Sequence, residues 1–266
     1  MKTVVITGST RGIGRGLADA FAARGCQVVV AGREAEAVAA VVAEIGTRHP
    51  GKVAGAACDI SDVDALRGLW STAVAAFGRV DVWINNAGMS IQRAPLHQAD
   101  PAELQQIVQT NLTGALLANR VVIAAMLEQG GGQVWNMEGF GSGGQTQPGM
   151  APYGATKRAI NYLNKALQKE LKDTPVQVCT LSPGIVVTDL LIGDYDVQSE
   201  SWAKAKKIFN ILGDTVDTVT PWLADRVLAS DKPGAKVAWL TTGKAFGRFM
   251  TAGFSKRDLF AESTES

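Results

Sequence analysis

Near its amino terminus the chain reads Thr3-Val4-Val5-Ile6-Thr7-Gly8-Ser9-Thr10-Arg11-Gly12-Ile13-Gly14. A short apolar run typical of a buried strand ends in a loop with glycines at 8, 12 and 14, and an amphipathic segment typical of a helix follows. Glycines at this spacing permit a tight turn, let backbone amides approach a phosphate, and let the helix pack on the strand. A pyrophosphate would then lie at the N-terminus of that helix. Glycines also serve ordinary turns, but the strand before and the helix after favour dinucleotide binding.

The same alternation of short apolar runs and longer amphipathic segments continues along the chain. It predicts an α/β fold of the Rossmann type, doubly wound, with a mostly parallel seven-stranded sheet and helices on both faces. We expect one domain over residues 1–266, with a cofactor-binding and catalytic core at 1–188, a substrate-covering segment at 189–220 and a distinct tail at 244–266. The expected strands are Thr3–Ile6, Gln27–Ala31, Val53–Ala57, Val82–Asn85, Gln133–Met137, Val176–Leu181 and Lys236–Leu240; the expected helices are Ile13–Ala23, Ala35–Thr47, Val63–Phe77, Pro101–Gln129 and Tyr153–Lys172.

Composition excludes several classes of protein. With 46% hydrophobic residues among 266, a substantial core is available, while a net charge of +1 with scattered basic residues gives no footprint for nucleic acid. Three widely separated cysteines, Cys26, Cys58 and Cys179, match neither a disulfide framework nor metal-ligand spacing, and indicate a reducing compartment. The apolar run begins directly after Met1, so we expect no signal peptide, and no stretch approaches the roughly 20 apolar residues of a membrane span. We expect a soluble, cytoplasmic protein, for which contact with a membrane surface stays open.

The ends of the second and third strands indicate which dinucleotide is bound. No acidic residue ends the second strand, where it would hold a ribose hydroxyl; instead Arg33 follows directly. Together with Arg11 it could grip a 2′-phosphate, which favours NADP, although both arginines could also be solvated surface residues. In Cys58-Asp59-Ile60, Asp59 could accept a hydrogen bond from the adenine amino group; the alternative role, capping the next helix, fits nearby Ser61 better.

A second group of motifs indicates chemistry. In Tyr153-Gly154-Ala155-Thr156-Lys157, a tyrosine and a lysine four residues apart share one helix face. The ammonium would favour the phenolate and let the phenol exchange a proton near neutral pH, although such pairs also occur on many helices without a function. Small residues in Asn85-Asn86-Ala87-Gly88 let the backbone lie against a cofactor. Asn111 is polar among apolar neighbours, and either bends its helix around a water or is exposed without consequence.

Hydrolase and metal chemistry find no support. His49 and His97, the only histidines, fall outside every motif, and there is no Gly-x-Ser-x-Gly stretch. No cluster has metal-ligand spacing, so we expect no metal site.

Taken in order, these motifs resemble those of the short-chain dehydrogenases/reductases. The resemblance covers Thr3 to about Thr188 and includes Pro183-Gly184. It implies that Tyr153 is the general acid/base, that Lys157 orients the nicotinamide ribose and lowers the Tyr153 pKa, and that Asn111 supports a proton relay. It also implies that Thr188 and the backbone after Pro183-Gly184 hold the carboxamide. Homo-oligomers through the helices at Pro101 to Gln129 and Tyr153 to Lys172 are a further implication.

One departure concerns the serine that the family usually carries beyond the asparagine of the fifth strand. Its expected position falls on Gly139, within Asn136-Met137-Glu138-Gly139-Phe140-Gly141-Ser142-Gly143-Gly144. Ser142 could take its place if the glycine-rich loop folds back, or the loop could lack a catalytic serine. Glu138 could offer a carboxyl instead, but an ionised carboxylate would repel a developing oxyanion.

This loop, the Tyr153 box and the carboxy-terminal third resemble the chlorophyll(ide) b reductases of plants. In the last third the similar stretches are Lys207 to Leu212, Asp214 to Val219 and Trp239 to Thr242. The resemblance implies NADPH-dependent reduction of a ring formyl group to hydroxymethyl, on a large apolar substrate, in the plastid stroma or at the thylakoid surface if the source is a plant. Relatives could reduce other aldehydes or ketones. A nucleotide-sensing protein that has lost catalysis is a further alternative, supported by Gly139.

The last third also contains candidate substrate contacts. Leu190 to Leu212 mixes apolar residues with charges, as a mobile lid over an apolar ligand would, or as an ordinary amphipathic helix packed on the core. Farther on, Phe246, Phe249, Met250 and Phe254 alternate with Lys244, Arg248, Lys256 and Arg257. This tail could wall the substrate pocket, rest on a membrane, pack against another subunit or join the core. Glu262 to Ser266 is expected to be disordered.

Overall fold

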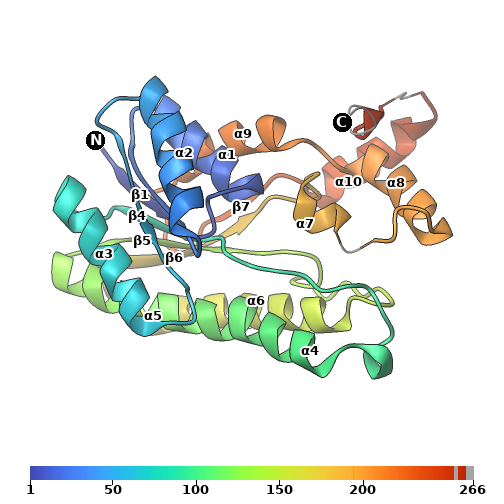
Figure 1. Cartoon of the computed structure of the whole chain (residues 1–266), viewed down its shortest axis with the longest axis horizontal. Coiled ribbons are helices and arrows are strands. Elements are labelled where there is room, and N and C mark those ends of the chain that lie inside the picture. Colours follow the sequence, from blue (N-terminus) through green and yellow to red (C-terminus); the bar gives the residue numbers. More distant parts are fainter. Residues whose placement is uncertain (194, 255–256, 262–266) are drawn as a thin grey trace.

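A computed structural model describes residues 1–193, 195–254 and 257–261. Its centre is a seven-stranded sheet in the order β3-β2-β1-β4-β5-β6-β7, with every pairing parallel (Figure 1). This confirms the predicted fold class. The strands are β1 (Thr3–Ile6), β2 (Gln27–Gly32), β3 (Val53–Ala57), β4 (Val82–Asn85), β5 (Gly132–Met137), β6 (Val176–Ser182) and β7 (Lys236–Ala238).

Helices cover both faces of the sheet because its central strands are apolar on both sides. In β1, Val4 and Ile6 face the core under α1, α2 and α9, whereas Val5 faces the core under α3 and α5. Figure 1 shows these two helical layers above and below the sheet. The main helices are α1 (Gly12–Ala23), α2 (Ala35–Arg48), α3 (Val63–Phe77), α4 (Pro101–Val108), α5 (Ala115–Gln129), α6 (Ala151–Glu170) and α9 (Val216–Leu228).

The helix expected over Pro101–Gln129 is interrupted by a π-helical turn. Gln109–Gly114 (η2) lies between α4 and α5. The N-cap of α3 also differs from the expectation, because the Asp62 side chain, not that of Ser61, accepts hydrogen bonds from the backbone amides of the first turn. By length and composition the run Pro101–Gln129 could cross a membrane, but half of its most apolar window is buried inside the protein. Ala118, Val122 and Met126 are buried against the sheet, as in a core helix.

The carboxy-terminal third forms α7 (Asp189–Ile192), α8 (Glu200–Leu212) and α10 (Thr242–Thr251). Phe209, the buried residue of α8, packs against Tyr195, Trp202 and Phe260, so this segment builds an aromatic cluster of its own. On α10, Phe246, Phe249 and Met250 are 68%, 48% and 66% exposed, which rules out their membership of the core. Lys256 and Glu262 to Ser266 lie outside the described residues.

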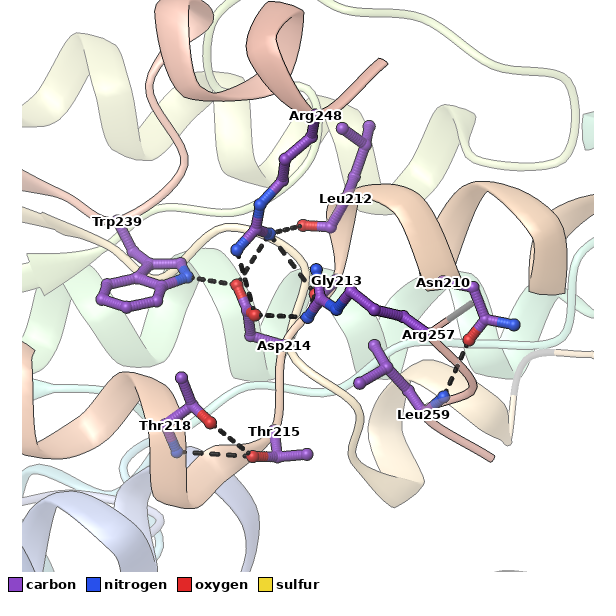
Figure 2. A network of polar contacts seen from close by, with 10 residues as sticks. All are labelled: Asn210, Leu212, Gly213, Asp214, Thr215, Thr218, Trp239, Arg248, Arg257 and Leu259. Carbon is purple, nitrogen blue, oxygen red and sulfur yellow. Dashed lines mark hydrogen bonds and ion pairs between the residues drawn. The ribbon is translucent and has the colours of Figure 1, made fainter. Parts of the chain in front are cut away.

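One buried carboxylate anchors this region (Figure 2). Asp214, between α8 and α9, is 3% exposed and accepts hydrogen bonds from Trp239 (2.5 Å), Arg248 (3.1 Å) and Arg257 (2.7 Å). Burial alone would raise the pKa of Asp214, but the hydrogen bonds from Arg248, Trp239 and Arg257 outweigh it and lower that pKa. The end of β7, helix α10 and the segment at 257–261 are thus tied to the residues that follow α8.

Candidate active site

The carboxyl ends of β1 and β4 meet in an extended cleft of about 640 Å³. Gly8 has a φ of +62°, and a Cβ there would lie 2.7 Å from the Cα of Ala87. A Cβ on Gly14 would overlap the Gly8 carbonyl oxygen and the side-chain amide of Asn86. The loop after β1 and the loop after β4 therefore pack backbone against backbone. Gly12, Ile13 and Gly14 place the start of α1 in the cleft wall, a position suited to a phosphate.

Most of the predicted cofactor residues line this cleft. They are Gly8, Thr10, Arg11, Gly12, Ile13, Gly14, Arg33, Asp59, Ile60, Asn86, Ala87, Gly88 and Thr188. Ser9 does not, because its buried hydroxyl donates to the Ile6 carbonyl (2.7 Å) and accepts from the Ala31 amide (2.9 Å), joining β1 to β2. Pro183 and Gly184 are also absent from the cleft wall, and Gly184 instead lies against Leu240.

The adenosine end of the cleft carries two exposed arginines and a carboxylate. Arg11 opens α1 and Arg33 follows β2, and both side chains reach the cleft wall from the surface. Asp59 accepts from the backbone amide (2.8 Å) and hydroxyl (2.7 Å) of Ser61, both on its Oδ1 atom. These bonds lower the pKa of Asp59, and the charge of Arg33 lowers it further, so Asp59 is an anionic acceptor at neutral pH.

Tyr153 and Lys157 lie on the first turns of α6. Lys157 is only 6% exposed, and its Nζ donates to the Met137 carbonyl (3.4 Å) and lies 5.7 Å from the centre of the Tyr153 ring. Burial lowers the pKa of Lys157 to about 8, against the opposing influence of Glu138. A buried ammonium is therefore held beside a phenol, as the sequence predicted.

Asn111 is buried beside the same pair, and the reading of it as an exposed residue is wrong. It lies in the π-helical turn η2 and is 2% exposed. Its Oδ1 accepts from the Met89 amide (2.8 Å), and its Nδ2 donates to the Met89 carbonyl (2.8 Å) and the Thr156 hydroxyl (3.3 Å). A Cβ on Gly88 would lie 3.3 Å from Asn111 Oδ1 and 3.7 Å from Lys157 Nζ, so the two side chains converge on Gly88.

Between these groups is a small polar space of about 10 Å³. Asn85, Asn111, Asn136 and Lys157 are among the residues that line it. This volume is close to the minimum that one water molecule needs, and the lining offers several polar partners. The space therefore has room for about one water molecule between the Lys157 and Asn111 side chains.

The loop after β5 folds back as the sequence allowed. The Ser142 amide donates to the Gly139 carbonyl (3.1 Å), and the Gly139 amide donates to the buried Ser142 hydroxyl (3.1 Å). A Cβ on Gly139 would overlap the Tyr153 hydroxyl, so Gly139 leaves that phenol the space it occupies. Ser142 is thus held within the turn by its two hydrogen bonds with Gly139.

Glu138 is excluded as a substrate group because its carboxylate is committed elsewhere. Its Oε2 pairs with Lys236 Nζ (2.7 Å), and its Oε1 accepts from Asn161 (2.8 Å). The buried carboxylate thereby links β5 to β7 and α6.

A buried row of asparagine side chains was missed from the sequence. Asn136, at the end of β5, accepts from Asn85 (2.8 Å) and Asn119 (2.9 Å) and donates to Asn164 (2.7 Å), which in turn donates to Thr180 (3.1 Å). The row connects β4, α5, β5, α6 and β6 directly behind Lys157. The only signal for it was a polar residue within or at the end of otherwise apolar strands and helices.

A dinucleotide cleft beside a phenol, a buried ammonium and an amide is typical of an oxidoreductase that acts on alcohol and carbonyl groups. The family model for short chain dehydrogenases matches residues 2–196, and the chain belongs to this family. The cleft of about 640 Å³, with the N-terminus of α1 in its wall, fits the NAD(P) cofactor that such enzymes use.

Similar proteins include plant enzymes. The chain is 34% identical over 98% of its length to a rice protein described as "Probable chlorophyll(ide) b reductase NYC1, chloroplastic", of which it spans 54%. It is 35% identical over 93% of its length to the chlorophyll(ide) b reductase NOL of Arabidopsis thaliana, of which it spans 72%. Thus the chain spans only about half the length of the first of these relatives.

Among solved structures, a 3-ketoacyl-(acyl-carrier-protein) reductase from Brucella melitensis complexed with NADH is similar with a TM-score of 0.77 and 27% identity. The similarity covers 90% of this chain and 96% of that one. That structure holds NADH, and a metagenomic short-chain oxidoreductase, similar with a TM-score of 0.70 and 28% identity over 89% of this chain and 95% of that one, holds NADP.

Proposed function

We propose that this protein uses NADPH to reduce the formyl group of chlorophyll(ide) b, or of a related tetrapyrrole, to hydroxymethyl. The observation that carries the proposal is the similarity to chlorophyll(ide) b reductases over nearly the whole chain, including the carboxy-terminal third. The altered loop after β5, in which Gly139 lies against the Tyr153 hydroxyl, is part of the same resemblance.

In this mechanism Tyr153, Lys157, Asn111 and Ser142 each have one task. When bound, the nicotinamide supplies the hydride that reduces the carbonyl carbon. Tyr153 donates its phenolic proton to the carbonyl oxygen, and Lys157 favours that transfer through its charge. Asn111 holds Met89 and supports a proton relay, while Ser142 fixes the turn that places Gly139 beside Tyr153. Positioning of the reacting groups supplies most of the rate, and the main-chain cradle and Thr188 orient the cofactor.

For the cofactor we propose NADPH over NADH. Arg11 and Arg33 both line the adenosine end, and the residue directly after β2 is Arg33 instead of a carboxylate that would hold a free ribose hydroxyl. Replacing Arg33 with glutamine should raise the KM for NADPH by roughly 10-fold and leave that for NADH nearly unchanged. Equal changes in KM for both cofactors would show that Arg33 does not bind the 2′-phosphate.

The test of the reaction is an absorption spectrum of the protein with NADPH and chlorophyllide b, run beside Tyr153→Phe. We expect the pigment bands to move toward those of the hydroxymethyl product, and the variant to bind NADPH but lose turnover by about 10²–10⁴-fold. Undiminished turnover in the variant would remove Tyr153 from the mechanism. Bound NADPH without any band shift would reject the substrate.

The glycine at position 139 is compatible with two other functions. The same acid, lysine and asparagine could serve another aldehyde or ketone, and the absence of a serine at that position is what a nucleotide sensor without catalysis would show. Assay of a panel of aldehydes separates the two, because turnover of any one excludes the sensor.

We also propose a homo-oligomer built on the face formed by α4, α5 and α6. Val108, Leu116 and Tyr162 are 44%, 45% and 75% exposed there, an apolar surface that a second copy would cover. Light scattering of the protein and of Tyr162→Glu tests this, with a smaller assembly expected for the variant. A protein that is monomeric before substitution would reject the proposal.

A further inference from the structure

Helix α10 turns its basic face toward the protein and its apolar face toward solvent. Lys244 and Arg248 are one helical turn apart, and both side chains contact the protein. The Lys244 ammonium lies 3.1 Å from the centre of the Trp239 ring, and Arg248 donates to the Leu212 carbonyl (2.8 Å). Figure 2 shows the Arg248 side chain pointing from α10 toward Asp214. A surface helix of a globular protein ordinarily has the reverse arrangement, with its apolar face packed on the core.

The outward face of α10 is formed by Phe246, Phe249 and Met250, and all three side chains are exposed. A helix turns by about 100° per residue, which places these side chains together and opposite Lys244 and Arg248. No residue of α10 is buried. The helix is thus held by its two basic side chains, and its three large apolar side chains form a surface of the kind that a partner covers.

Helix α8, which packs beside α10, adds exposed lysines to this surface (Figure 1). Lys204, Lys207 and Ile208 are exposed, and their spacing of three and four residues puts them on one face of α8. Lys204 lies 3.5 Å from Glu200 in the preceding turn, whereas none of the described carboxylates pairs with Lys207. The surface therefore combines large apolar side chains with cations beside them.

Positive charge is in excess around the two helices. Residues 200–214, 242–254 and 257–261 contain six lysines and arginines but three carboxylates. Two of these cations, Arg248 and Arg257, share the one buried carboxylate of Asp214. Burial lowers the pKa of Lys244, and the charges of Arg248 and Arg257 lower it further against the influence of Asp214. The local field at α10 is accordingly positive.

This combination of charge and hydrophobicity distinguishes between partners. A second copy of the chain would bring the same lysines into the contact, and like charges repel one another. A bilayer with anionic headgroups offers acyl chains to the apolar side chains and negative charge to the lysines. The surface of α8 and α10 is therefore complementary to an anionic bilayer and not to itself.

We propose that α10 and the outward face of α8 bind the surface of a membrane that contains anionic lipids. Phe246, Phe249 and Met250 contact the acyl chains, while the lysines of α8 remain at the headgroups. The helix lies in the plane of the membrane, because its 10 residues extend only about 15 Å, about half the thickness of the hydrocarbon core. None of these three residues lines the cleft, so the inference goes beyond the proposed reaction and does not depend on it.

The test is flotation of the full chain with vesicles of phosphatidylcholine alone and of phosphatidylcholine mixed with phosphatidylglycerol. We expect binding to the mixed vesicles to be at least about 10-fold stronger and to weaken as salt is added. The double variant Phe246→Asn, Phe249→Asn should lose at least about 10-fold in binding, and Lys207→Gln about 5-fold.

The matched controls are Leu127→Asn and Lys169→Gln, which change an exposed apolar residue of α5 and an exposed lysine of α6. Both should bind the vesicles as the unsubstituted protein does, and binding of NADPH reports that every variant is folded. Absence of binding to both kinds of vesicle, equal binding to both, or binding that the double variant retains would overturn the inference. A smaller assembly of the double variant in light scattering, without vesicle binding by the unsubstituted protein, would assign this surface to a second copy instead.

Discussion

Replacement of Lys157 with methionine should make the protein without cofactor more stable while abolishing its activity. Lys157 is buried, and burial lowers its pKa from 10.5 to about 8. Each pH unit by which a pKa moves corresponds to about 1.4 kcal/mol, so holding this ammonium in the folded protein at pH 7 costs about 3 kcal/mol. Loss of the hydrogen bond from Lys157 to Met137 lowers the stability of the variant by about 1 kcal/mol. We therefore expect Lys157→Met to raise the free energy of unfolding by about 2 kcal/mol, since methionine fills a similar volume without charge.

The sign of the pH dependence gives a second check. The folded pKa is lowered, so the unfolded chain binds more protons between about pH 8 and pH 10.5, and the stability of the unsubstituted protein rises with pH in that window. The gain in the free energy of unfolding of Lys157→Met over the unsubstituted protein should be largest below pH 8 and decline above it. Urea denaturation at pH 7 and pH 9.5 measures this, with Lys165→Met, an exposed lysine on the same helix, as control. A variant less stable at pH 7, or an advantage that does not change with pH, would refute the reasoning.

Two further predictions concern stability and the loop after β5. Asp214→Asn should lower the free energy of unfolding at pH 7 by about 3–5 kcal/mol, because Arg248 would lose its buried carboxylate partner. The pKa of Asp214 is lowered in the folded protein, so the stabilisation by its carboxylate is present above about pH 4 and is lost as the pH falls further. Urea denaturation from pH 7 to pH 3 measures both effects, and a constant difference between the two proteins would contradict the assignment. Gly139→Ser should displace the Tyr153 hydroxyl and lower kcat by at least about 10-fold, since one proton-transfer group is misplaced. Steady-state kinetics with NADPH binding as control measures this, and an unchanged kcat would show that the loop yields without disturbing Tyr153.

Sequence patterns sufficed for the sheet because its strands are short apolar runs and its loops are marked by glycine. The strand ending at Asn85 and the helix Val63–Phe77 begin and end where they were predicted. The approach failed where tertiary contacts decide. In the sequence, Ser9 resembles a loop hydroxyl beside a phosphate, but its hydroxyl is hydrogen-bonded to the backbone of Ala31 in the adjoining strand β2. Nothing local distinguishes Asp62 from Ser61 as a helix cap.

The candidate site was predictable to the extent that its residues sit at strand ends or on one helix face. Tyr153 and Lys157 follow from helix periodicity, and Gly8 and Gly14 from the turn they form. The burial of Asn111 was not predictable, because the π-helical turn depends on how α4 and α5 pack.

The π-helical turn makes the catalytic geometry sensitive to chain length as well as to side-chain identity. Each residue of a helix turns it by about 100°, and a π turn accommodates about one residue more than an α turn. Removal of Thr110 alone would allow α4 and α5 to merge into one regular helix. Glu103 and Gln106, which line the cleft from α4, would then rotate away from it, or Asn111 would leave Met89. A deletion that removes none of the proposed catalytic side chains would thus silence the site by changing the phase of one helix.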